Sequence, residues 1–362
     1  MSFPSKKAEN SGNIVHGNAP FSLFEDAHFA PDRNWPGYHN QSNFKEFVNT
    51  NCSHVIITVA NLVRANNSHP ATIARYEDFS RTLDGYDVPI VLFGLGAQSN
   101  TSTIEDATLP PEGVELLKKI NERCLSVSVR GQFTAALFKK YASTRNVHVT
   151  GCPSFFMKPE VFTELRQASQ QTATRFAYNG THYDRPAERQ LLHNALSRYE
   201  FIVEPANPRL YKYHLESIAS PEAAEIPDEL AELVAGPRPA WTRSELATYF
   251  SSRFKLFRHL EPWLDFNREH VDFTYGTRFH VNMASMLSAV PALWLTHDSR
   301  TRELTETLHL PAVTLEEAHG MSQAELHRAA DHEPLFDNLK SSFQRFNSFL
   351  DSAELPRVPY LF

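Results

Sequence analysis

An arginine and a histidine two positions apart, Arg278 and His280, have the side chains best suited to chemistry in this sequence. They follow a β-rich run at residues 271–275 and precede a helical pattern predicted to begin near Val281. Residues two apart in an extended segment point to the same side. A guanidinium, a titratable imidazole and the N–H groups of a helix start would therefore surround one anion. The alternative is structural: an arginine that pairs with a carboxylate and a histidine that caps the helix.

A second turn of the same kind follows the next β-rich run and carries His297, Asp298, Ser299 and Arg300. Asp298 or Ser299 is suited to cap the helix that begins here. We expect His297 and Ser299 to line a ligand-binding cleft because they lie at the turn itself, with Arg300 adding positive charge beside them. In the structural alternative, the arginines of this helix pair with its own glutamates on a solvated face.

A glycine-rich stretch, G-L-G-A-Q from Gly94 to Gln98, follows a predicted strand. Ser99 stands where a dinucleotide-binding fingerprint has its third glycine, and no helix follows at once. The stretch is therefore a weak nucleotide signature. Glycines do let a ligand approach the backbone closely, so Gly94, Gly96 and Gln98 are candidate substrate-binding residues.

Three other positions near strand ends carry candidate groups. Arg130 follows the predicted strand at 125–129 and faces the turn after it. Asn18 ends an amide-rich segment, residues 11–18, that we interpret as a first strand-to-loop element lining the cleft; the alternative is a flexible entry segment. Cys152 is expected to be a packed thiol, because nothing nearby in the sequence would lower its pKa.

Short β-rich runs alternate with helical patterns, which is typical of βαβ units and a parallel sheet with right-handed crossovers. The first half predicts strands at residues 54–60, 89–93, 125–129 and 147–150, and helices at 71–83, 111–123 and 132–141. The second half predicts strands at residues 175–178, 201–203, 255–257, 271–275, 291–296 and 312–315. Residues 334–350 carry apolar side chains at helical spacing and predict a long amphipathic helix.

The chain has 362 residues, more than one hydrophobic core usually serves, so two α/β domains are expected. The alternation breaks after Ser154, and a polar helical stretch follows. We place an N-terminal Rossmann-like domain at residues 1–165 and a C-terminal one, with the amphipathic helix, at residues 166–362. Two such halves facing each other across a cleft would bring loops from strand carboxyl ends into that cleft, where open α/β sheets bind ligands.

The composition argues against several classes of protein. The net charge is −7, from 35 basic and 42 acidic residues, and no basic tract stands out, so nucleic acid is not expected as a partner. The three cysteines form no C-x-x-C pair, which indicates buried thiols in a reducing cytoplasm and no zinc site. No apolar run approaches the ~20 residues of a transmembrane helix, and the N-terminus lacks the apolar part of a signal peptide.

Taken in order, these stretches resemble the polysaccharide pyruvyltransferase family over roughly residues 11–315. The match rests on G-L-G-A-Q at 94–98, S-V-R at 128–130, G-C-P-S at 151–154, G-T-R-F-H at 276–280 and residues 290–300, of which the last two are fairly specific as a pair. The resemblance implies a GT-B-like arrangement, with the acceptor on the N-terminal side and the Arg-x-His pair in the C-terminal domain. Two positions depart from the pattern. Val281 replaces a small residue, which would narrow the approach to His280, and Cys152 replaces an aspartate.

The resemblance further implies transfer of pyruvate from phosphoenolpyruvate to two hydroxyls of one sugar, forming a cyclic ketal and releasing phosphate. His280 would be the general acid/base, since its reference pKa of ~6.5 lets it exchange a proton near neutrality. Arg278 would hold the phosphate or carboxylate and stabilise developing charge. Arg130, Ser299 and Arg300 would supply the remaining anion contacts. No metal is expected, because the sequence shows no cluster of metal ligands and arginines can stabilise the charge. No cofactor is expected either, since phosphoenolpyruvate itself is the donor substrate.

The acceptor would be a polysaccharide or its precursor, free or lipid-linked. A lipid-linked acceptor would bring this cytoplasmic protein to the inner face of the membrane. One alternative is a GT-B glycosyltransferase using a nucleotide sugar, which usually holds the ribose with acidic residues; residues 276–304 show no clear pair of that kind. Another is a catalytically silent, glycan-binding protein of the same fold.

Overall fold

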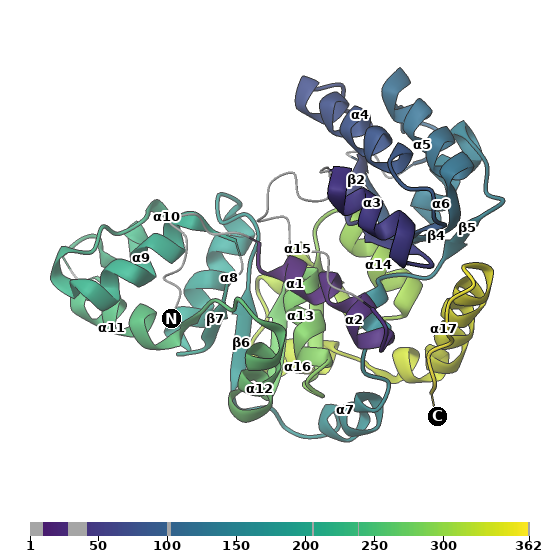
Figure 1. The fold of residues 1–362 in the computed structure, drawn as a ribbon. Helices are drawn as coiled ribbons and strands as arrows, with labels where there is room; N and C mark the ends of the chain where they lie inside the picture. The colour runs from purple at the N-terminus through teal and green to yellow at the C-terminus, as the bar shows by residue number, and fades with distance from the viewer. Residues whose placement is uncertain (1–9, 28–41, 100–102, 205, 238, 361–362) are drawn as a thin grey trace. The chain divides into compact units, whose positions relative to one another are not determined.

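The computed structural model describes residues 10–27, 42–99, 103–204, 206–237 and 239–360. Its contacts divide the chain into two compact units, each assembled from three segments (Figure 1). The Arg130 unit comprises residues 16–159, 298–310 and 333–362. The Arg278 unit comprises residues 1–15, 160–297 and 311–332.

The Arg130 unit is built on a parallel sheet with the order β1-β3-β4-β5, in which β2 pairs with the end of β3. Its strands are β1 (Val55–Thr58), β2 (Asn61–Arg64), β3 (Ile90–Gln98), β4 (Cys124–Val129) and β5 (Val147–Val149). Its main helices are α3 (Ser42–Asn51), α4 (Pro70–Asp84), α5 (Pro111–Arg123), α6 (Gln132–Tyr141), α14 (Ser299–Leu308) and α17 (Glu333–Ser352). Helices α4 and α5 lie side by side (Figure 1).

Strand β3 runs through the centre of this sheet, and every one of its residues except Gln98 is buried. Burial on both faces explains its almost continuous apolar sequence. The G-L-G-A-Q stretch was expected to follow this strand, but it forms the second half of β3. Gly94, with a φ of +70°, and a register shift between Leu92 and Leu95 bend the strand there without ending it.

Helix α17 confirms the predicted amphipathic helix. Phe346 stacks on Phe156 with ring centroids 4.0 Å apart, and Phe349 meets Phe93 edge-on at 5.4 Å. The apolar stripe is buried along its whole length; its members are Leu335, Leu339, Phe343, Phe346 and Phe349. The C-terminal helix thus completes the core of the Arg130 unit.

The two units differ from the predicted division at residue 165. Helices α14 and α17 belong to the Arg130 unit, although both lie beyond that point in the sequence. Packing explains the difference: α17 buries its aromatic side chains against Phe93 and Phe156, and Glu303 of α14 accepts hydrogen bonds from Thr134 of α6.

The Arg278 unit is built on a six-stranded sheet with the order β11-β10-β9-β6-β7-β8, all parallel. Its strands are β6 (Phe176–Asn179), β7 (Phe201–Val203), β8 (Phe254–Lys255), β9 (Phe273–Gly276), β10 (Ala292–Thr296) and β11 (Ala312–Thr314). Its helices include α7 (Val161–Ser169), α8 (Pro186–Ser197), α9 (Pro208–Ala219), α10 (Asp228–Ala231), α11 (Arg243–Arg253), α12 (Leu260–His270), α13 (Phe279–Met286), α15 (Leu315–Ala318) and α16 (Gln323–Ala329). Helices α9 and α11 pack together beyond β7 (Figure 1).

The prediction of two Rossmann-like α/β units is confirmed, since the ten strands predicted between residues 54 and 315 all appear in one of two parallel sheets. Strand β2 was not predicted. The expected strand near the N-terminus is wrong, because residues 12–17 form the short helix α1 (Gly12–Gly17), in which Asn10 Oδ1 accepts the Gly12 N–H at 3.1 Å. No helix in the described part of the chain is long and apolar enough to cross a membrane.

Candidate active site

The turn after β9 depends on Gly276, whose φ is +151°. A Cβ here would lie 1.9 Å from the backbone oxygen of Asn179, at the end of neighbouring β6. Only glycine therefore lets the two strand ends come this close. The buried Asn179 side chain then accepts the Arg278 N–H at 2.8 Å and donates to the Tyr275 carbonyl oxygen at 3.1 Å.

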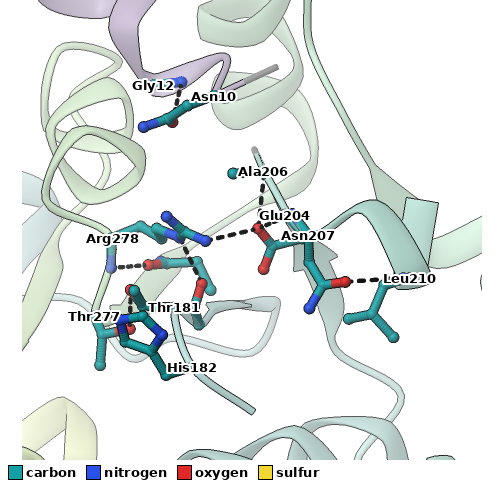
Figure 2. Close-up of polar contacts among 12 residues, drawn as sticks. Asn10, Gly12, Thr181, His182, Glu204, Ala206, Asn207, Leu210, Thr277 and Arg278 are labelled. Carbon is teal, nitrogen blue, oxygen red and sulfur yellow. Dashed lines mark hydrogen bonds and ion pairs between the residues drawn. The ribbon is translucent and has the colours of Figure 1, made fainter. Parts of the chain in front are cut away.

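The Arg278 side chain is fixed at the carboxyl edge of the sheet (Figure 2). Its Nε donates to the Gly180 carbonyl oxygen at 2.7 Å, and its Nη2 lies 3.4 Å from a carboxylate oxygen of Glu204. The Arg278 side chain remains 19% exposed, whereas Glu204 is completely buried. The structural alternative, an arginine paired with a carboxylate, is therefore real, and it leaves part of the side chain accessible to a ligand.

Glu204, directly after β7, was missed by the sequence analysis. One carboxylate oxygen accepts the N–H groups of Ala206 at 2.9 Å and Asn207 at 3.0 Å, and the other accepts the Tyr183 hydroxyl at 2.8 Å. Burial raises the pKa of Glu204, while Arg278 and these donors oppose the rise. These three donors together fix the orientation in which the carboxylate holds Arg278.

A second buried carboxylate, Glu188 at the start of α8, accepts hydrogen bonds from the turns that follow β6 and β9. It accepts the N–H of Thr181 at 2.6 Å, the N–H of His182 at 2.9 Å and the Thr277 hydroxyl at 2.6 Å. Because these donors follow two neighbouring strands, β6 and β9, Glu188 ties both turns together. Because Arg278 directly follows Thr277, the hydrogen bond between Thr277 and Glu188 also restrains the backbone at Arg278.

His280 lies in the first turn of α13, which begins at Phe279 and not near Val281 as predicted. Arg278 ends the extended backbone, with φ −85° and ψ 102°, so the alternation argument for both side chains pointing to the same side does not apply. The His280 Cβ lies 3.3 Å from the position that a Cβ on Gly12 of α1 would take. Val281 is 1% exposed and faces the core, which removes it from the surface by which a ligand would approach His280.

The turn after β10 places His297 beside a histidine that the sequence analysis missed. The ring centroids of His297 and His182 are 6.2 Å apart, with the planes at 74°. His182 follows β6 and His297 follows β10, and both strands flank β9. The Arg278 unit therefore gathers Arg278, His182 and His297 after three neighbouring strands, with His280 two residues beyond Arg278 in the first turn of α13.

The Arg130 unit contains the other predicted residues. Its glycines Gly94 and Gly96 leave room for side chains of the protein itself. A Cβ on Gly94 would lie 2.8 Å from Pro153 Cδ, and a Cβ on Gly96 would lie 2.6 Å from Arg130 Cδ. The expectation that these glycines admit a ligand to the backbone is therefore replaced by an internal role: they seat Pro153 and Arg130.

The Arg130 guanidinium is 3% exposed and binds neutral acceptors. Its Nε donates to the Gly94 carbonyl oxygen at 3.0 Å and its Nη1 to Asn61 Oδ1 at 3.2 Å. Burial lowers the pKa of Arg130, and the charge of Arg300 lowers it further, while Cys152 and the acidic side chains of α14 oppose the change. Arg130 and Arg300 are thus close enough to repel each other.

The start of α14 is occupied by internal bonds. Asp298 caps the helix by accepting the Thr301 N–H at 2.8 Å, as predicted, and lies 3.1 Å from Arg300 Nη2. The Ser299 hydroxyl donates to the Ser99 carbonyl oxygen at 3.2 Å, so Ser299 anchors the loop after β3.

The remaining predicted positions have simpler surroundings. Gln98 ends β3 and is half-buried, and Asn18 lies between α1 and α2 (Ala19–Leu23). Cys152 is a buried thiol whose Sγ lies 3.0 Å from Ser154 Oγ, and burial raises its pKa, as expected. Cys52 is only half-buried. No cluster of metal-binding side chains occurs among the described residues.

The structure thus divides the predicted site residues into two groups. Arg278, His280 and His297 belong to the Arg278 unit. The Arg130 unit holds the rest, namely Asn18, Gly94, Gly96, Gln98, Arg130, Ser299 and Arg300. The missed residues, among them Glu204 and His182, also follow strands, so a search for polar side chains after every predicted strand would have found them.

Comparisons with known proteins place these motifs in a family. No curated protein matches the chain. Three solved structures are distantly similar. MnaA from S. aureus, in a co-structure with UDP, has 13% identity over 96% of this chain and 88% of its own, with a TM-score of 0.42. A putative UDP-N-acetylglucosamine 2-epimerase from Listeria monocytogenes has 12% identity over 93% and 85%, with a TM-score of 0.42. A UDP-forming α,α-trehalose-phosphate synthase from Burkholderia vietnamiensis has 10% identity over 94% and 83%, with a TM-score of 0.41.

These structural similarities are too distant to bear on function. The sequence motifs are more informative, because the polysaccharide pyruvyl transferase family matches residues 10–299 and so includes both the Arg130 motif and the Arg-x-His pair. The chain therefore belongs to the polysaccharide pyruvyl transferase family.

Proposed function

We propose that this transferase moves pyruvate from phosphoenolpyruvate onto two hydroxyls of one sugar in a polysaccharide or its precursor, forming a cyclic ketal and releasing phosphate. The observation that carries the proposal is the fixed, partly exposed Arg278 at a strand end, with His280 two residues onward. A dianionic donor requires a cation of this kind, and its methylene carbon requires a proton.

Arg278 is the group that binds an anionic part of the donor. Its bond to the Gly180 carbonyl oxygen and its pairing with Glu204 fix the guanidinium before the substrate arrives. A preorganised cation stabilises developing charge without reorganising at the moment of reaction. Arg278 would thus favour the transition state over the ground state.

His280 is the proposed proton carrier. In the first step the oxygen of one sugar hydroxyl forms a bond to the central carbon of phosphoenolpyruvate, and the methylene carbon accepts a proton and becomes a methyl group. Departure of phosphate and closure by the second hydroxyl complete the ketal. An imidazole with a reference pKa of ~6.5 can take the hydroxyl proton and supply the methyl proton.

Arg130 and Arg300 are proposed to bind an anionic substrate group within their own unit. This role is supported by their charge and by their place in one unit, with Arg130 directly after β4 and Arg300 in the first turn of α14. Gly94, Gly96, Gln98, Asn18 and Ser299 are then residues that shape or support that unit's surface.

Phosphate release from phosphoenolpyruvate tests the proposal. The acceptors are the methyl glycosides of glucose, galactose and mannose, and the ketal is identified by mass spectrometry and NMR. We expect Arg278→Ala and His280→Ala each to lose ~10²-fold or more of the activity. Arg268→Ala, an exposed arginine of α12, is the matched control and should keep it. Full activity in both site variants would exclude the assignment.

The alternatives make different predictions for binding. A nucleotide-sugar enzyme binds UDP more tightly than phosphoenolpyruvate, and a silent glycan-binding protein binds oligosaccharides but neither anion. Calorimetry with the three ligands separates these cases from the proposed function.

A further inference from the structure

Two imidazoles meet beside the Arg278 turn, and the proposed reaction has so far used neither. Strand β9 lies between β6 and β10, so the residues after these three strands come together at one edge of the sheet. His182 follows β6 and His297 follows β10, with ring centroids 6.2 Å apart. Figure 2 shows the His182 ring beside Thr181 and Thr277, next to Arg278.

The backbone that carries His182 is firmly held although its side chain is exposed. Its own N–H is donated to Glu188, and the hydroxyls of Thr181 and Thr277 are 2.8 Å apart. The following residue, Tyr183, is 2% exposed and donates its hydroxyl to Glu204. An exposed imidazole on an anchored turn is suited to meet a ligand in a fixed geometry.

The surrounding charges favour an anion over a cation. Both nearby carboxylates are already engaged: Glu204 by Arg278 and three other donors, and Glu188 by three donors. The other ionisable groups here are Arg278 on the β9 turn, His280 on α13, the exposed Asp184 and Arg185 on the same loop as His182, and Asp298 directly after His297. Asp298 is engaged as well, since it caps α14 and pairs with Arg300. Two imidazoles and one arginine therefore face a ligand without a free buried carboxylate between them.

We propose that His182 and His297 together bind the phosphoryl group of the donor and receive it as the leaving phosphate, while Arg278 holds the carboxylate. This inference rests on the proposed function. As the bond between carbon and the phosphate oxygen breaks, its electron pair stays with phosphate, and a protonated imidazole of the pair donates its proton to that oxygen. The second sugar hydroxyl forms the new bond to the same carbon and returns its proton to the ring.

Anion binding tests the inference without an acceptor. Sulfate, which stays a dianion over the titration range of imidazole, is the probe beside phosphoenolpyruvate, in calorimetry on the full chain. We expect His182→Gln and His297→Gln each to bind sulfate about tenfold more weakly than the unaltered protein, since each removes one charge-assisted donor. The affinity of the unaltered protein should be higher at acidic than at alkaline pH, because a protonated imidazole gives an anion a charge-assisted hydrogen bond, and this dependence should vanish when both histidines are replaced.

His193→Gln on α8 is the matched control, because its ring bonds the Glu229 carbonyl oxygen away from this turn. Unaltered sulfate affinity in both site variants, or a pH dependence that survives their combination, overturns the histidine site alone. If the unaltered protein binds neither sulfate nor phosphoenolpyruvate, the proposed function fails as well. Thermal unfolding of every variant shows whether a loss of binding reflects a loss of fold.

Discussion

The two units hold their arginines in opposite ways. Arg278 is partly exposed and lies beside Glu204, a carboxylate with no exposed surface. Arg130 is 3% exposed, yet its hydrogen bonds go to the neutral oxygens of Gly94 and Asn61. The more deeply buried cation is thus the one with the weaker compensation, although desolvation makes an unpaired charge more costly.

The carboxylates near Arg130 are committed to other partners. Asp298 caps α14 and pairs with Arg300, and Glu303 accepts both the N–H and the hydroxyl of Thr134. Arg278 has a buried carboxylate as its counter-ion. Within the described part of the chain, the hydrogen bonds of Arg130 go to neutral oxygens, and the nearby Asp298 and Glu303 already bond groups of α14 and α6. The difference suggests that Arg278 is held in one direction, and that Arg130 is left with charge for a ligand to neutralise.

Removing the counter-ion of Arg278 should have the largest effect. Glu204→Gln keeps the shape of the side chain but takes away its charge, so the guanidinium loses the group that directs it. We expect kcat/KM for phosphoenolpyruvate to fall ~10²-fold or more, in line with the cost of breaking a buried ion pair. Steady-state phosphate release measures it.

Glu200→Gln is the matched control, because Glu200 and Glu204 lie at opposite ends of β7. Glu200 is 3% exposed just before β7 and accepts the Tyr275 hydroxyl at 2.7 Å, at the amino end of the sheet. Both variants should lower the unfolding temperature, but only Glu204→Gln should weaken phosphoenolpyruvate binding. Equal effects of the two on binding would mean that Glu204 acts through stability alone.

The titration of Glu303 tests the surroundings of Arg130, the second arginine of the comparison. Burial raises the pKa of this carboxyl to about 7, even though Thr134 donates two hydrogen bonds to it and Arg130 lies nearby. A carboxyl whose folded pKa exceeds its unfolded pKa of ~4.3 stabilises the protein at low pH, and that contribution is lost as the pH rises to about 7. Glu303→Gln should therefore gain stability relative to the unaltered protein over this window, by on the order of 2–3 kcal/mol.

Chemical denaturation at a series of pH values measures the difference. Glu306→Gln, an exposed residue of the same helix, should show no such gain. A stability difference between the Glu303 variant and the unaltered protein that is flat across the window would show that Glu303 does not titrate there.

The sequence predicted the helices and strands whose apolar residues recur at a regular spacing. Alternation of apolar runs and helical patterns located every strand except β2, and the stripe of Leu335, Leu339 and Phe343 predicted α17. It did not predict the division into units, because the return of α14 and α17 to the first sheet depends on long-range packing that leaves no local signal.

The sequence likewise predicted some residues of the candidate site and missed others. Arg278 was found because a glycine, an arginine and a histidine follow one strand. Glu204 and His182 were missed because only some of the strand ends were searched for polar side chains, and their importance comes from which strands are neighbours. The order that brings β6, β7 and β10 around β9 is a property of the sheet and is not written in any one segment.

A methyl group at Gly96, where it would crowd the Arg130 side chain, should have a smaller effect on stability. A Cβ on Gly96 would lie 2.6 Å from Arg130 Cδ and 3.1 Å from the Ala60 carbonyl oxygen. Gly96→Ala should cost on the order of 2 kcal/mol of unfolding free energy, since either the guanidinium or the strand must shift. Gly320→Ala is the control, because nothing lies within 4 Å of its added Cβ. Urea denaturation of both variants decides whether Gly96 is needed for this packing.

Giving Arg130 a counter-ion of its own should have the smallest effect and is the sharpest test of the comparison. Cys152 is fully buried and close enough to Arg130 to influence its pKa. In Cys152→Asp the attraction between the two charges should roughly balance the cost of burying a second one, so stability should change by ~1 kcal/mol or less. When His182 and His297 are also replaced by Gln, so that the histidine pair does not contribute, binding of sulfate should weaken, because the new carboxylate would satisfy the charge that we expect a ligand to neutralise. If sulfate binds as well as before and the protein loses several kcal/mol, the aspartate is unpaired, and Arg130 is a structural cation whose neutral partners already suffice.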